Sequence, residues 1–233
     1  MSLNQARSIR DTLARMDAAA NDKSTYMQSF TPDVRSLLTY ADAIASQVDR
    51  PDPTATPQAN FLKLNANREK ALKFSTAMLN RASALLNSAI SDVQRREDER
   101  LGFTKGSPDR GAIIAKFSQM NQADQMNQVS AWMKDAKNGA VMLGVISSAD
   151  GFLTGLTPEL SIKLRNDFVK SYAPDLANER DELNEQYTAS LAAARSMALL
   201  SEAISDPRRV EEIQRLKADH DAATAVFSGQ PPA

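Results

Sequence analysis

The residues of this chain that could do chemistry are few, and the first of them is its single histidine. His220 lies four residues after Leu216 and three before Ala223, on the apolar side of the last expected helix. The aspartates on either side of it cannot pair with it, because adjacent residues on a helix point in different directions. A metal-binding Glu-x-x-His pattern needs a carboxylate at position 217, which is occupied by Lys217. We therefore interpret His220 as a structural residue at a helix contact.

Other signals of catalysis or cofactor binding are equally sparse. Acidic pairs such as Glu179 and Glu182 alternate with Arg180, which is the pattern of an exposed helix face. The loop 106–111 is superficially like a phosphate-binding loop, but Pro108 removes one of its backbone N–H donors. The chain has no nucleotide-binding loop or nucleophile elbow, and without cysteine it has no thiol chemistry or disulfides. We therefore expect no catalytic, cofactor or metal site and no enzyme activity.

The composition indicates a globular helical chain. Of 233 residues, 42% are hydrophobic and 24% charged, and the 6% of aromatic residues suits a core of closely packed Ala-rich helices better than a β-sandwich. The net charge of −1 argues against nucleic acid as a partner, since binding phosphates usually needs a basic excess. Without an apolar run of about 18 residues or a signal-peptide core, we expect no membrane-spanning helix, no membrane as the main partner, and a cytoplasmic or virion-associated protein.

Five of the ten prolines lie in a pattern typical of helix starts. Proline fits the first helical position because its missing N–H would have no partner there. A preceding Ser, Thr or Asp can cap the free amides, and a following acid meets the positive end of the helix dipole. The predicted starts are Thr31-Pro32-Asp33, Ser107-Pro108-Asp109, Thr157-Pro158-Glu159, Ala173-Pro174-Asp175 and Asp206-Pro207-Arg208.

The longest helical pattern runs from residue 60 to about residue 100. Its seven-residue repeat consists of Leu72, Leu79, Leu86 and Val93, with Ser75, Ala82 and Ala89 at the alternate positions. Leucine on one line and small residues on the other allow two helix backbones to approach closely, as in a coiled-coil-like pair. Roughly 40 residues at 1.5 Å each predict a helix of about 60 Å and an elongated molecule. We interpret the mixed charges of residues 94–100 at its end as solvated surface.

Seven of the eight glycines lie between Gly102 and Gly155, which predicts a bend after the long helix. We expect the next helix to run from Pro108 through the amide-rich residues 119–128, which form either a solvated face or a polar contact between subunits. The methionines near Trp132 are interpreted as core filler.

The most unusual segment is Gly139–Leu156, in which Asp150 is the single charged residue. As a helix that is apolar all round, it must be buried on all sides. It is either the central helix of its own bundle, an element that inserts into a neighbouring subunit, or a membrane contact too short to span a bilayer. The candidate interaction residues are Val141, Met142, Leu143, Val145, Ile146, Phe152 and Leu153.

We therefore predict an all-α protein, an elongated bundle of about seven helices with a long coiled-coil-like central helix hairpin. The expected domains are an N-terminal helical hairpin (1–48), a Pro-rich linker (49–59), a main helical bundle (60–227) and a disordered tail (228–233).

Long Ala-rich helices without a cofactor motif are common among bacteriophage virion components and secretion-apparatus subunits. We accordingly expect a structural or assembly protein, a helical building block or adaptor that binds itself or neighbouring subunits through helix–helix contacts. The alternative is a regulatory nucleic-acid- or chaperone-type binding module. Its basic contacts would be Arg95, Arg96, Arg100, Lys105 and Arg110, although interleaved acids weaken such a patch.

Overall fold

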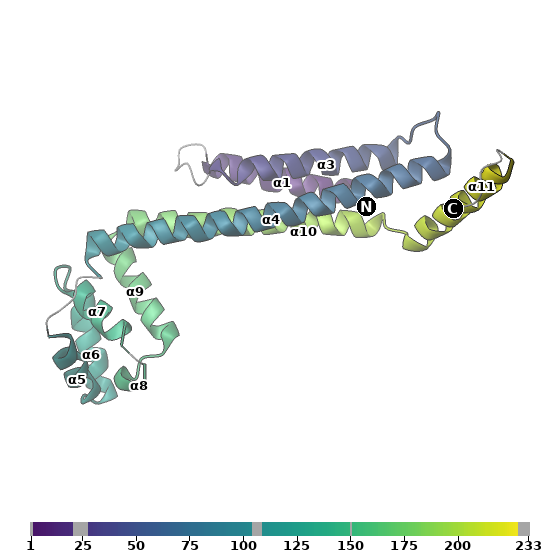
Figure 1. Cartoon of the computed structure of the whole chain (residues 1–233). Helices are drawn as coiled ribbons and strands as arrows, with labels where there is room; N and C mark the ends of the chain where they lie inside the picture. Colours follow the sequence, from purple (N-terminus) through teal and green to yellow (C-terminus); the bar gives the residue numbers. More distant parts are fainter. Residues whose placement is uncertain (1, 21–27, 104–108, 150, 228–233) are drawn as a thin grey trace. The chain divides into compact units, whose positions relative to one another are not determined.

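Figure 1 shows the computed structural model of the chain, which describes residues 2–20, 28–103, 109–149 and 151–227. Every regular element in these ranges is a helix, which confirms the all-α fold class. The helices are α1 (Ser2–Ala20), α3 (Thr31–Asp49), α4 (Pro57–Leu101), α5 (Arg110–Ser118), α6 (Gln122–Met133), α7 (Gly139–Ser147), α8 (Gly151–Thr154), α9 (Pro158–Tyr172), α10 (Pro174–Ala203) and α11 (Pro207–Phe227). The described ranges thus contain ten helices, of which α8 is a single turn, instead of about seven.

The additional helices come from the region after α4. We expected one helix to continue through residues 119–128, but α5 ends at Ser118 and α6 begins at Gln122. Asn121 causes this break, because its side-chain oxygen accepts a hydrogen bond from the backbone N–H of Asp124 at 2.9 Å and so caps α6. A second break follows at the end of α7, where Ser148 closes the helix before α8.

The predicted helix starts can be compared with the structure at four places. Helices α9, α10 and α11 begin at Pro158, Pro174 and Pro207, and α3 begins one residue before Pro32. Thr157 caps α9 by accepting the Leu160 N–H at 3.2 Å, and Asp206 accepts the Arg209 N–H at 3.1 Å. Thr31 does not cap α3, because its hydroxyl donates to the Gln28 carbonyl instead. The fifth start falls on Ser107 and Pro108, outside the described residues, and α5 begins at Arg110.

The contacts divide the chain into two compact units. The first unit consists of residues 1–84 and 186–233, and the second of residues 85–185, so the boundary falls within α4 and α10. The predicted hairpin and linker lie within the first unit, whereas the predicted main bundle, 60–227, is distributed over both. Pro57, which we assigned to the linker, is the first residue of α4, a position that proline tolerates. The predicted tail, 228–233, lies outside the described residues.

In the first unit, α1 packs against α3 through apolar stripes on the facing sides of the two helices. The buried residues of the two stripes are Ala6, Ile9, Leu13, Met16, Val34, Leu37, Ala41, Ile44 and Ala45. Ion pairs join the same helices, from Arg10 to Asp42 at 2.8 Å and from Arg35 to Asp17 at 3.0 Å. Because these pairs are largely exposed, each contributes less than about 1 kcal/mol, and apolar burial holds the hairpin together.

Helix α4 buries its line of small residues more deeply than its line of leucines. In the line of small residues, Ser75, Ala82 and Ala89 are buried. In the line of leucines, Val93 is buried, whereas Leu72, Leu79 and Leu86 are half-buried. Small side chains on the inner line leave room for a neighbouring backbone, while the leucines cover the sides of the contact. The small residues of α4 therefore lie on its buried side, and the close approach of a second helix backbone to them stays a prediction.

In the second unit, α7 packs against α5, α6 and α9. Close approach of the backbones requires glycine at two positions of α7. A Cβ atom on Gly139 would lie 2.0 Å from the Trp132 carbonyl oxygen, and one on Gly144 would lie 2.3 Å from the Phe103 carbonyl oxygen. Both obstacles are backbone atoms, which cannot move aside as a flexible side chain can. Gly102 adopts a φ of 85° directly after α4 and ends that helix, as the glycine distribution predicted.

We predict that Gly144→Ala destabilises the protein by about 1–3 kcal/mol or more, because the new methyl group overlaps the Phe103 carbonyl. Gly111→Ala is the matched control, since a Cβ on this helical glycine meets nothing within 4 Å. The control should leave the free energy of unfolding unchanged or raise it by up to about 1 kcal/mol. Urea unfolding followed by circular dichroism measures both, and equal midpoints for the two variants would contradict the close packing of α7.

Candidate interaction surfaces

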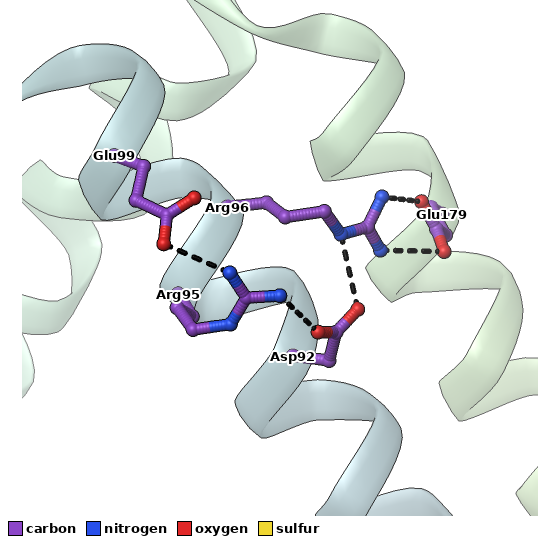
Figure 2. A network of polar contacts seen from close by, with 5 residues as sticks. All are labelled: Asp92, Arg95, Arg96, Glu99 and Glu179. Carbon is purple, nitrogen blue, oxygen red and sulfur yellow. Dashed lines mark hydrogen bonds and ion pairs between the residues drawn. The ribbon is translucent and has the colours of Figure 1, made fainter.

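The C-terminal turns of α4 carry a network of ion pairs within the second unit (Figure 2). Arg96 binds both carboxylate oxygens of Glu179 on α10, at 2.8 and 3.0 Å, and its Nε donates to Asp92 at 3.1 Å. Arg95 donates to Asp92 at 2.7 Å and to Glu99 at 2.8 Å. The Arg95 hydrogen bond lowers the pKa of the Asp92 carboxyl below its ordinary 3.8. The network therefore joins α4 to α10.

Glu97 is the centre of a second and more deeply buried cluster. Its side chain is 0% exposed, and its two oxygens lie 3.2 Å from Arg180 Nη1 and 3.2 Å from Arg165 Nη2. Arg165 also lies 2.9 Å from Asp98 Oδ1, an ion pair without hydrogen-bond geometry, and its guanidinium covers the Phe103 ring at 4.5 Å. This cluster connects α4, α9 and α10 in the second unit.

The interpretation of residues 94–100 as solvated surface is therefore wrong for Glu97. Sequence reasoning grouped it with its charged neighbours, but Glu97 lies four residues after the buried Val93 and continues the buried line of α4. This position in the helical repeat was the signal that could have found it. A carboxylate at a core position must be paired, because an isolated buried charge is very costly.

The basic residues that we named as possible nucleic-acid contacts form hydrogen bonds and ion pairs within the chain instead. Arg95 and Arg96 bind the carboxylates named above, and Arg100 binds Asp175 at 2.7 Å. Arg110 donates to the Ser148 carbonyl and hydroxyl, and Lys105 lies outside the described residues. The three guanidiniums near the end of α4 thus meet carboxylates of their own chain.

We predict that Glu97→Gln lowers the free energy of unfolding by roughly 3 kcal/mol, because it leaves two guanidiniums facing a neutral partner. Glu99→Gln is the control in the same run of charges. Its side chain is 62% exposed and pairs with an exposed arginine, so it should cost less than about 1 kcal/mol. Chemical denaturation of both variants tests this, and a loss in Glu97→Gln as small as that in the control would show that the buried cluster does not stabilise the fold.

The predicted interaction segment forms the centre of the second unit. Leu143, Val145 and Ile146 are buried, while Val141 and Met142 are half-buried. The side chains of Phe152 and Leu153 lie outside the described residues. Among the three interpretations of Gly139–Leu156, the arrangement of α5, α6 and α9 around α7 supports the central helix of its own bundle. Val141 and Met142 keep the exposure that a partner would need.

Met142 lines an apolar pocket of about 210 Å³ formed by α5, α6 and α7. Phe117 is buried, and its ring stacks on Trp132 with centroids 5.7 Å apart. The pocket is lined by Ile113, Lys116, Phe117, Met120, Gln128, Trp132 and Met142. Met120 and Trp132 are half-buried and Met126 is 46% exposed, so the prediction that they are core filler is wrong. Their apolar surface faces the solvent in this unit.

Helix α11 carries a second exposed apolar surface. Leu216 is 54% exposed, Ala223 is exposed, and Val210 and Ile213 are half-buried. Near the start of α11, the Arg209 guanidinium lies over the Phe61 ring at 4.7 Å. His220 lies on the same stripe and is exposed, so no helix within the described residues provides the contact that we expected for it. The spacing does place these apolar residues on one side of α11, but no helix of the described residues covers that side.

Among the described residues, no helix is long and apolar enough to cross a membrane. The same residues contain no group of three or more side chains that could hold a metal ion. Comparisons of the chain with protein-family models, with curated proteins and with solved structures find no match.

Proposed function

We propose that this chain is a structural or assembly protein, a helical building block or adaptor that acts through helix–helix contacts. The observation that carries the proposal is the exposed apolar stripe of α11, with Leu216 at its centre. A row of apolar side chains along one side of a helix that no other helix covers is a feature of surfaces where another helix binds.

The pocket on the second unit supports the adaptor form of this role. It combines aromatic and methionine side chains, which are enriched where proteins bind each other. A chain with one apolar surface on each unit can contact two neighbours and so link them in a larger assembly. A phage virion or a secretion apparatus is the kind of assembly that the composition favours.

The nucleic-acid alternative has less support. Binding to phosphates requires basic side chains with donors to spare, and Arg95, Arg96 and Arg100 bind acidic side chains of the same chain. The balance of 28 basic and 29 acidic residues also provides no overall attraction to a polyanion.

We predict that sedimentation equilibrium gives a mass above 25.4 kDa that rises with protein concentration. Leu216→Asp should return the mass toward that of the single chain, because a carboxylate at the centre of the stripe opposes its burial. Ile162→Asp is the matched control, since Ile162 is a 60% exposed apolar residue on α9 outside both surfaces. A wild-type mass of 25.4 kDa at every concentration up to about 1 mM would overturn the proposal of a self-assembling building block.

A further inference from the structure

The exposed stripe of α11 follows a coiled-coil repeat. Arg209, Ile213, Leu216, His220 and Ala223 are separated by four, three, four and three residues, which is the spacing of alternating a and d positions. Ile213 and His220 occupy a positions, and Leu216 and Ala223 occupy d positions. Of these four, Leu216, His220 and Ala223 are exposed and Ile213 is half-buried. A seam of this kind normally lies against a second helix.

We propose that α11 pairs with α11 of a second copy of this chain as a parallel two-stranded coiled coil centred on Ile213 and Leu216. The inference rests on the proposed assembly function and names the partner of this surface. The pairing begins after Arg209, which is held over the Phe61 ring of its own chain. From residue 213 to residue 223 the seam is about 16 Å long, so the contact is short and reversible.

The charges beside the seam favour a second copy in parallel orientation. Glu212 occupies a g position and Lys217 the following e position. In a parallel pair, a g residue faces the e residue five positions later on the partner helix. Glu212 of each copy would therefore meet Lys217 of the other, which forms two attractive contacts around the two-fold axis.

The antiparallel registers that bury both Ile213 and Leu216 place like charges together. An antiparallel pair brings g positions opposite g positions and e positions opposite e positions. When Ile213 faces Ala223 of the partner, Lys217 faces Lys217 and Asp219 faces Asp219. When Ile213 faces Leu216 of the partner, Glu212 faces Asp219. The parallel pair avoids all of these repulsions.

Single cysteines test the orientation, because the natural chain has none. Ala223→Cys places a thiol at a d position, where the two copies of a parallel pair approach each other. Ala218→Cys places it at the outward f position of the same exposed helix. Under mild oxidation of the full chain, we expect Ala223→Cys to form disulfide-linked dimers at least about tenfold faster than Ala218→Cys. Equal rates would overturn the parallel pair.

Charge reversal tests the contact between Glu212 and Lys217 separately. Glu212→Lys and Lys217→Glu should each weaken dimer formation several-fold in sedimentation equilibrium, and the double variant should restore it. Each single change also alters pairs within its own helix, but restoration in the double variant requires that the two positions meet. A double variant that associates no better than the weaker single variant would overturn the proposal.

His220→Leu provides a change in the opposite direction. A leucine at this a position adds apolar surface to the seam, so the dissociation constant of the dimer should fall by about tenfold or more. An unchanged dissociation constant would show that residue 220 lies outside the contact. If the wild-type chain associates but the cysteine and charge variants fail, the assembly function stands and the α11 pair is wrong. If the wild-type chain stays monomeric, the self-assembling building block and the α11 pair are both wrong.

Discussion

Glu97 imposes the constraint on which the second unit is built. Its carboxylate is removed from water at the end of α4, so the fold must supply positive charge from other helices. Arg165 on α9 and Arg180 on α10 supply it, and Arg96 adds a bidentate bond to Glu179 next to them. The charged side chains of this cluster are paired only when α4, α9 and α10 pack as they do here. The charged cluster therefore specifies how α4, α9 and α10 meet, while apolar burial provides most of the stabilisation.

The same cluster sets the direction and register of α4 relative to α10 in the second unit. Arg96 reaches Glu179, and Arg100, one turn later on α4, reaches Asp175, one turn earlier on α10. The two helices therefore run antiparallel there.

Close packing of the small helices in this unit depends on glycine, since Gly139 and Gly144 allow α7 to lie against backbone carbonyls.

Features encoded by neighbouring residues could be predicted from the sequence. Proline with a capping residue marked the starts of α9 and α11, and the distribution of the glycines marked the end of α4 at Gly102. Features that depend on contacts between distant residues could not. Glu97 resembled its charged neighbours until α9 and α10 were in place, and the exposure of His220 depends on the absence of a covering helix among the described residues. Of the candidate interaction residues, Leu143, Val145 and Ile146 are buried among α5, α6 and α9, and an interaction through Val141 and Met142 stays a prediction.

Association through α11 is the central claim, and amide hydrogen exchange at two protein concentrations tests it most directly. An amide of α11 exchanges when the helix unfolds locally, and pairing with a second copy opposes that unfolding. Because more of the chain is paired at higher concentration, exchange between residues 213 and 223 should slow as the concentration rises. Residues 71–82 of α4 are the internal reference, since their buried line is covered within the chain at any concentration. Pairing through α11 predicts that protection from exchange rises with protein concentration in α11 and does not change in residues 71–82. Identical exchange of α11 at both concentrations would contradict it.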